Sequence, residues 1–188
     1  MKVCVVGTGY VGLVAGTCIA ESGNDVICVD IDAGKVERLR AGEVPIYEPG
    51  LTEMLDRNIE SGRLVFTDDL GKAYAEAEAI FICVGTPTGK DGRCDLGAVH
   101  AVADDVADAL ATRDEHVTVV VKSTVPVGTT NGVAERIRER CEVPFSIVNN
   151  PEFLREGSAL EDFTRPDRIV CGVEDTHGAT IMQRIHAP

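Results

Sequence analysis

The sequence predicts an α/β fold, a doubly wound and mostly parallel sheet with helices on both faces. Three observations predict it. Apolar runs of strand length alternate with longer amphipathic stretches along nearly the whole chain. The runs are almost continuously hydrophobic, as in strands that are covered on both faces. A glycine-rich turn follows the first run, at residues 7–12. This alternation is typical of parallel strands joined by right-handed crossovers.

The expected strands follow from the apolar runs, and the expected helices follow from the amphipathic stretches. The strands are expected at 3–6, 25–29, 64–66, 79–84, 118–121, 145–148 and 168–171. The helices are expected at 10–22, 33–41, 50–61, 95–111 and 129–140, and a further helix begins near the chain end. Stretch 95–111 has the clearest helical spacing, with Asp95 as its expected N-cap. Asp32 is the expected N-cap of 33–41.

Composition limits the classes of function. A chain of 188 residues with a net charge of −13 is one acidic domain, which repels nucleic acid and anionic membranes. No apolar run could cross a bilayer, and Met1 leads directly into a strand without a signal-peptide pattern, so we expect a cytosolic protein. The Lys-poor acidic surface is typical of proteins from high salt and also of ordinary acidic enzymes, and both interpretations stay open.

The cysteines and histidines suggest no metal site. The seven cysteines are an odd number without a C-x-x-C pair, so neither a disulfide framework nor a zinc site is suggested. Four of them lie in apolar runs and are expected to be buried, namely Cys4, Cys28, Cys83 and Cys171. The four histidines have no Ser or carboxylate partner at a recognisable spacing, so we expect surface or helix positions.

The turn Gly7-Thr8-Gly9-Tyr10-Val11-Gly12 matches G-x-G-x-x-G, and it follows a strand and opens a helix. Gly7 permits the tight turn, Gly9 lets the backbone approach a pyrophosphate, and Gly12 lets the helix pack on the strand. The pyrophosphate would lie at the helix N-terminus, facing unpaired N–H groups. The sequence therefore predicts a Rossmann-type dinucleotide site. The alternative is a glycine-rich turn without a ligand.

Asp30 ends the second strand, where an acidic side chain accepts hydrogen bonds from the adenosine ribose hydroxyls. The same carboxylate would repel a 2′-phosphate. The expected cofactor is therefore NAD and not NADP.

Three further strings follow later strands, at the sheet edge where doubly wound folds bind ligands. They begin at Cys83, Lys122 and Asn150 and join Gly, Pro and hydroxyl residues to a strand end: Cys83-Val84-Gly85-Thr86-Pro87-Thr88, Lys122-Ser123-Thr124-Val125-Pro126-Val127-Gly128-Thr129-Thr130 and Asn150-Pro151-Glu152-Phe153-Leu154-Arg155-Glu156-Gly157-Ser158-Ala159. The hydroxyls of Thr86 and Thr124 are expected near a nicotinamide or its ribose.

With Tyr47-Glu48-Pro49-Gly50-Leu51 added, the chain resembles the UDP-glucose/GDP-mannose dehydrogenase family over nearly all of its length, and most closely the members that act on UDP-glucose. The resemblance implies oxidation of the C6 alcohol of a nucleotide sugar to a carboxylate with two NAD. UDP-N-acetylmannosamine, UDP-N-acetylglucosamine and GDP-mannose are the alternative substrates. A non-catalytic NAD-binding module is the alternative from another class.

The resemblance also implies residue roles. Contacts with NAD fall to Gly7, Gly9, Tyr10, Val11, Gly12, Asp30, Lys35, Thr86, Thr124 and Glu156. The sugar side falls to Glu152, Phe153, Leu154, Arg155 and Glu156. Thr124, Glu152 and Glu156 would be catalytic: Thr124 orients the oxygen at the reacting carbon, Glu152 is the candidate base for thioester hydrolysis, and Glu156 contacts both NAD and the reacting region.

Each role has a simpler alternative. Thr124 could cap a turn, Glu152 could bind backbone amides of its own loop, and Lys35 could be a solvated helix residue. Arg155 is expected to be exposed or ion-paired, with substrate contact as the alternative.

The family's nucleophilic Cys, with its assisting Lys and Asp, lies in a later Gly-Gly-Ser-Cys segment that these 188 residues lack. The family's central dimerisation helix and C-terminal nucleotide-sugar domain are also missing. We therefore expect residues 1–188 to be a single NAD-binding domain, truncated at Pro188 and inactive alone. The full-length protein is expected to form a homodimer or a larger assembly.

Overall fold

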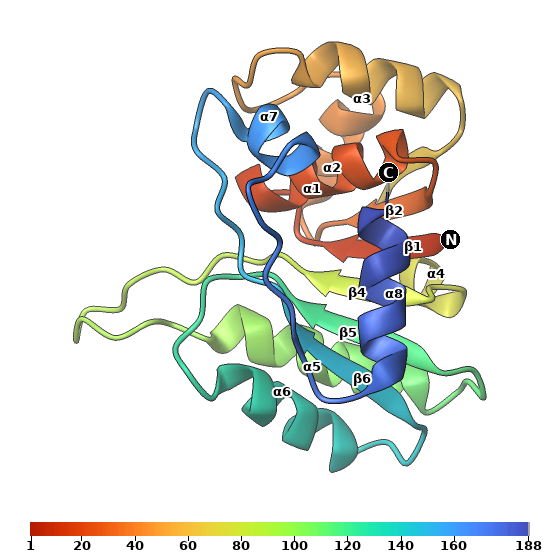
Figure 1. Ribbon diagram of the computed structural model, residues 1–188, viewed down its shortest axis with the longest axis vertical. Coiled ribbons are helices and arrows are strands. Elements are labelled where there is room, and N and C mark those ends of the chain that lie inside the picture. Colours follow the sequence, from red (N-terminus) through yellow and green to blue (C-terminus); the bar gives the residue numbers. More distant parts are fainter. Residues whose placement is uncertain (188) are drawn as a thin grey trace.

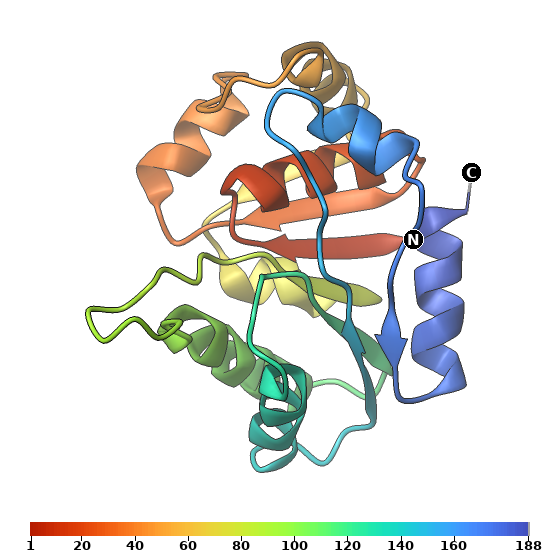
Figure 2. The same ribbon diagram turned by 60° about the vertical axis from the view of Figure 1, so that its left-hand side comes forward.

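The computed structural model describes residues 1–187, and a seven-stranded sheet runs through them (Figures 1 and 2). The strand order is β3-β2-β1-β4-β5-β6-β7. All neighbouring pairs are parallel except β6 and β7, which are antiparallel. The order reverses between β1 and β4, and ligands of doubly wound sheets bind at such a reversal. The predicted fold class is therefore confirmed.

Six of the seven expected strands are confirmed to within a few residues. The strands are β1 (Lys2–Val6), β2 (Asp25–Val29), β3 (Leu64–Thr67), β4 (Ala79–Ile82), β5 (Val117–Val121), β6 (Phe145–Asn149) and β7 (Gly172–Val173). The expected strand at 168–171 is wrong. Ile169 and Val170 line a cavity and are about two-fifths exposed, and only the next two residues join the sheet.

The five expected helices and the helix near the chain end are confirmed. The helices are α1 (Tyr10–Glu21), α2 (Ala33–Arg40), α3 (Leu51–Glu60), α4 (Leu70–Ala75), α5 (Gly97–Leu110), α6 (Thr129–Arg138), α7 (Ala159–Thr164) and α8 (Thr176–His186). The sequence did not predict α4 and α7, because six residues are too few to show a helical period. The expectation for the chain end at Pro188 falls outside the described residues.

The helices form two layers, with α1 and α3 on one side of the sheet and α5 and α6 on the other (Figure 1). Each layer has its own aliphatic core. One contains Leu13 and Leu55, and the other contains Val106 and Ile137. Because both faces are covered, the central strands are buried throughout, as their continuous hydrophobicity predicted.

Of the two expected N-caps, Asp32 is confirmed and Asp95 is displaced by one residue. The Asp32 carboxylate caps α2 by accepting a hydrogen bond from the Lys35 amide at 3.0 Å. Asp95 accepts from the Gly97 amide at 2.8 Å, although Leu96 holds the N-cap position of α5. The hydrogen bond expected from Asp95 is therefore present, one residue earlier than a true N-cap.

Three of the four cysteines expected to be buried are buried, namely Cys4, Cys28 and Cys83. Cys171 is not: it is partly exposed, because its segment lies outside the sheet. All seven cysteines are free thiols.

The expected surface or helix positions of the histidines are confirmed, and the exposed His116 also has a serine partner. Its Nε2 lies 2.9 Å from the Ser146 hydroxyl, and its ring packs against that of His177 with centroids 4.0 Å apart. The pairing of β5 with β6 brings His116 and Ser146 together, which spacing along the sequence could not show.

Two further properties concern the described residues as a set. Within residues 1–187, no helix combines the length and the apolar character that a bilayer crossing requires. Over the same residues, no three His, Cys, Asp or Glu side chains are grouped so that they could hold a metal ion.

Candidate functional site

The glycine turn joins β1 to α1 in a conformation that needs glycine at two positions. Gly7 has a φ of +94°, and a Cβ there would lie 2.9 Å from the Cys83 carbonyl oxygen. A Cβ at Gly12 would overlap the Gly7 carbonyl oxygen and lie 3.1 Å from the Cys83 Cβ. The turn is therefore packed tightly between α1 and the end of β4.

The space in front of Gly9 is open. A Cβ at Gly9 would meet nothing within 4 Å, and Gly9 is the N-cap of α1 without a side-chain cap. The first backbone hydrogen bond of the helix runs from the Leu13 amide to the Gly9 carbonyl. The amides at Tyr10, Val11 and Gly12 therefore have no partner within the helix and can face an anion.

Asp30, at the end of β2, lies directly beside this turn. Its Oδ2 accepts hydrogen bonds from the Thr8 amide at 2.8 Å, the Thr8 hydroxyl at 2.7 Å and Lys35 Nζ at 2.9 Å. Burial by itself would raise the pKa of Asp30, but the hydrogen bonds from Lys35 and Thr8 outweigh it and lower the pKa to about 2. Asp30 is therefore a fixed, ionised acceptor at neutral pH.

Lys35 is not the solvated residue of the simpler alternative. Its side chain is 26% exposed and forms an ion pair with Asp30. The turn, Asp30 and Lys35 all line one cavity of about 340 Å³, which runs on along α5 past Ala98. The predicted cofactor residues Gly7, Gly9, Asp30 and Lys35 are thus brought together.

Thr86 and Thr124 lie on neighbouring loops, after β4 and β5. The Thr86 hydroxyl donates to the Thr124 carbonyl at 2.8 Å, and the Ser123 hydroxyl donates to the Val84 carbonyl at 2.7 Å. Thr124 is exposed, and within residues 1–187 its hydroxyl caps no turn. The two loops therefore hold each other and leave the Thr124 hydroxyl available.

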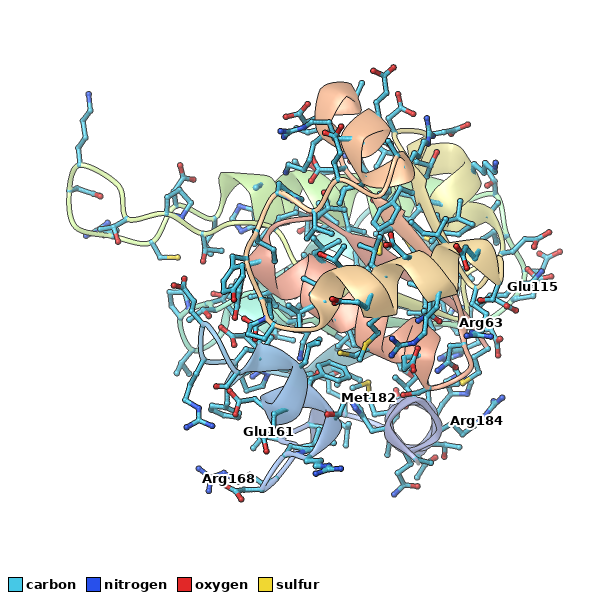
Figure 3. The ribbon with its side chains drawn as sticks, turned by 90° about the horizontal axis from the view of Figure 1, so that it is seen from above. Arg63, Glu115, Glu161, Arg168, Met182 and Arg184 are labelled. Carbon is cyan, nitrogen blue, oxygen red and sulfur yellow. The ribbon has the colours of Figure 1, made fainter. Side chains whose placement is uncertain are left out.

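The predicted sugar-side residues Glu152 to Arg155 line a second cavity, of about 420 Å³. Glu152 Oε2 accepts from the Leu154 amide at 2.7 Å, so the hydrogen bond of its simpler alternative is present and occupies one oxygen. Phe153 is 57% exposed. Glu161 on α7 and Arg168 on the following segment belong to the same lining (Figure 3).

Arg155 lines the second cavity but is held in an ion pair, whereas Glu156 is not part of that lining. Arg155 pairs with Asp162 at 2.6 Å, as the ion-paired interpretation predicted. Glu156 is exposed and absent from the lining of the second cavity. Its charge helps to raise the pKa of Tyr10, after burial and Glu48, and the Tyr10 hydroxyl donates to the carbonyl of the preceding residue, Arg155, at 3.3 Å.

Glu48 is a site residue whose role sequence reasoning missed. It is 5% exposed, and its carboxylate accepts from the Tyr10 hydroxyl at 2.7 Å, the Gly157 amide at 2.9 Å and the Ala159 amide at 2.7 Å. Burial would raise the pKa of Glu48, but these hydrogen bonds lower it. Glu48 therefore fastens the loop of residues 150–158, which carries the predicted sugar-side residues, to the first turn of α1. The string Tyr47–Leu51 marked the position without revealing the partners.

The lining of the second cavity includes a buried lysine, Lys122. Lys122 is 4% exposed, and its Nζ donates to Asn150 Oδ1 at 3.1 Å and lies 5.7 Å from the centre of the Phe163 ring. Burial lowers the pKa of Lys122. His186 lines the same cavity, and burial, followed by the charge of Lys122, lowers the pKa of His186 to about 4.

We expect the stability of the chain to fall as the pH falls from about 6.5 to about 4. The unfolded chain protonates His186 near 6.5, whereas the folded chain does so only near 4. Between these values the unfolded state binds the extra proton, so about 2–3 kcal/mol is lost on acidification. Burial, followed by His177, lowers the pKa of His116 and acts in the same direction.

Urea unfolding between pH 7.5 and 4.5 measures this dependence. His186→Gln should flatten it. Equal slopes for the variant and the unaltered chain would contradict the assignment to His186.

Comparison with known proteins shows which family contains a domain similar to this chain. Residues 1–188 match the UDP-glucose/GDP-mannose dehydrogenase family, NAD binding domain. The UDP-glucose 6-dehydrogenase of Rhizobium meliloti strain 1021 is 49% identical over 100% of this chain and 43% of its own length. The chain thus spans less than half the length of the curated relatives it matches.

Solved structures agree in fold. A UDP-glucose dehydrogenase from the archaeon Pyrobaculum islandicum superposes with a TM-score of 0.95 at 48% identity, over 98% of this chain and 43% of that one. A GDP-mannose dehydrogenase from Pseudomonas aeruginosa also reaches a TM-score of 0.95, at 37% identity, over 99% of this chain and 44% of that one.

Proposed function

The chain belongs to the UDP-glucose/GDP-mannose dehydrogenase family as its NAD-binding domain, and from this premise we propose that it is the cofactor-binding part of an enzyme that oxidises the C6 alcohol of UDP-glucose to a carboxylate. NAD bound here would accept a hydride from C6 in each of two oxidations. The observation that carries the proposal is the open glycine turn and the ionised Asp30 in one cavity.

Asp30 and the turn would hold the adenosine half of the cofactor. The unpaired amides of α1 face the position of the diphosphate, and Asp30 Oδ1, which already accepts from the Asp32 amide at 3.1 Å, has capacity for a ribose hydroxyl. The negative charge of Asp30 would oppose a 2′-phosphate, since Lys35 is already paired with it. This supports NAD over NADP.

The catalytic side would be formed by Thr124, Glu152 and Glu156. The exposed Thr124 hydroxyl would orient the oxygen at the reacting carbon, and the second carboxylate oxygen of Glu152 would take a proton from water. Glu156 would contact both NAD and the reacting region. Phe153, Leu154 and Arg155 would line the sugar side of the same loop.

The covalent step would need a reactive thiol, and the buried cysteines of this chain are poorly suited to supply it. Burial raises the pKa of Cys18 and of Cys83 to about 12, so neither forms a thiolate readily. We propose that the nucleophile and the nucleotide-binding residues belong to a longer, cytosolic protein that forms a homodimer or a larger assembly. A sensor without chemistry is disfavoured, because it has no use for the cavity lined by residues 152–155.

The function is tested by assaying the full-length protein with NAD or NADP and a panel of UDP-glucose, UDP-N-acetylmannosamine, UDP-N-acetylglucosamine and GDP-mannose. We expect two NADH for each UDP-glucose consumed, and a kcat/KM at least about 100-fold lower with NADP, since a close pair of like charges costs several kcal/mol. The 188-residue chain alone should show no turnover. Absence of activity with every sugar would refute the proposal, and preference for another sugar would correct the substrate.

A further inference from the structure

Asp105 on α5 is an unpaired charged residue in the wall of the glycine-turn cavity. The charged side chains of that lining are Asp30, Lys35 and Asp105, and the first two pair with each other. Within residues 1–187, the half-buried Asp105 carboxylate has neither a hydrogen bond nor an ion pair. Its neighbours Asp104 and Asp108 both pair with Arg140. Asp105 is therefore free to accept a hydrogen bond from a ligand in this cavity.

The order of groups along the cavity indicates which part of the ligand reaches Asp105. The diphosphate position lies at Gly9 and the ribose position at Asp30, so the base attached to that ribose extends toward α5. This end of the cavity is walled by small or aliphatic side chains on two sides: Ile31, Leu70, Ala98, Ala101 and Val102. Ile31 is 88% exposed, which suits a side chain that a flat ring covers on binding.

Carboxylate chemistry then selects the base. An ionised carboxylate only accepts hydrogen bonds, and adenine carries an exocyclic amino group that only donates. We propose that Asp105 is a specificity-determining residue of the cofactor site, which accepts a hydrogen bond from the adenine amino group of the dinucleotide. This inference rests on the dinucleotide site proposed above.

The surroundings of Asp105 favour such a donor. Burial, followed by the charges of Asp108 and Asp104, raises the pKa of Asp105, so the unligated carboxylate lies in an unfavourable field. An arriving N–H donor relieves part of that cost. The alternative role for Asp105 is an interaction with the Tyr74 hydroxyl. Within residues 1–187 that hydroxyl is buried without a hydrogen-bond partner, and the pKa of Tyr74 is raised by burial and, more weakly, by the charge of Asp105.

The test compares NAD with nicotinamide hypoxanthine dinucleotide, in which a carbonyl oxygen replaces the amino group. Titration calorimetry on the 188-residue chain should show NAD binding about tenfold tighter, because the carbonyl leaves Asp105 facing an acceptor. Asp105→Ala should remove the preference. Asp105→Asn should remove or reverse it, since its amide can donate to the carbonyl.

Two matched variants separate base selection from charge and packing. Asp108→Asn removes the same charge from the same helix and should keep the tenfold ratio. Tyr74→Phe should also keep it; if Asp105 served only Tyr74, the Asp105 and Tyr74 variants would lose stability alike without changing the ratio. The inference is overturned if the unaltered chain binds both dinucleotides within about twofold, or if both Asp105 variants keep its ratio. Absence of NAD binding would instead refute the dinucleotide site itself.

Discussion

Replacing Gly12 with alanine is expected to destabilise the chain by about 2–4 kcal/mol and to abolish NAD binding. The new Cβ would overlap the Gly7 carbonyl oxygen, which is backbone and cannot swing aside, and the Cys83 Cβ 3.1 Å away closes the other side. Helix α1 would have to move away from β1. For a domain of this size the melting temperature should fall by about 10 °C, measurable by circular dichroism.

Gly9→Ala is the matched control, because it introduces the same methyl group into the same turn, three residues before Gly12. Its Cβ would meet nothing within 4 Å, and the φ of −70° at Gly9 suits alanine. Stability should therefore change by less than about 0.5 kcal/mol, whereas NAD affinity should fall at least about tenfold, since the methyl group occupies the diphosphate approach. Equal melting temperatures for the two variants would show that the turn is not packed as described.

Replacing Glu48 with alanine is expected to cost about 2–4 kcal/mol of folding free energy, because the Gly157 and Ala159 amides and the Tyr10 hydroxyl lose their common acceptor. Glu48→Gln should recover only part of it, since its NH₂ group must face at least one of these donors. Urea unfolding measures both. Limited proteolysis should show earlier cleavage in the loop that carries Glu152.

Tyr10→Phe provides the control, because it removes one of the three donors and leaves the carboxylate bound to both amides. It should cost about 1 kcal/mol, the usual contribution of one hydrogen bond. If Glu48→Ala cost no more than Tyr10→Phe, the anchoring of the loop through its amides would be wrong.

Local patterns predicted most of the fold, and they singled out the glycine turn and Asp30, which the folded chain places in one cavity. Strands covered on both faces are continuously apolar, and this pattern predicted six strands. The spacing of the glycines, together with Asp30, predicted the position of the turn. These features are legible because each depends on residues close together in the chain. The resemblance to a family added the sugar-side loop, which spacing alone would have left as an ordinary turn.

The remainder depends on residues that only the folded chain brings together. Glu48 and Ala159 are 111 residues apart, so no local sequence pattern can reveal the hydrogen bond between them. The same holds for His116 and Ser146. The strand predicted at 168–171 is wrong for a related reason. An apolar run indicates contact with other apolar groups, but it does not distinguish a strand in a sheet from a segment that lines a cavity.

The hydrogen bonds that Thr8 and Lys35 donate to Asp30 link the folding of the chain to cofactor binding. Thr8 and Lys35 fix this carboxylate in one rotamer before any cofactor arrives, so the conformational entropy of the acceptor is already lost when the chain folds. A ribose would therefore bind to a preorganised carboxylate. The free energy of its hydrogen bonds would not be reduced by the cost of ordering that side chain. Removing the hydrogen bonds from Thr8 or Lys35 to Asp30 would therefore weaken cofactor binding even if every contact between Asp30 and the ribose were kept.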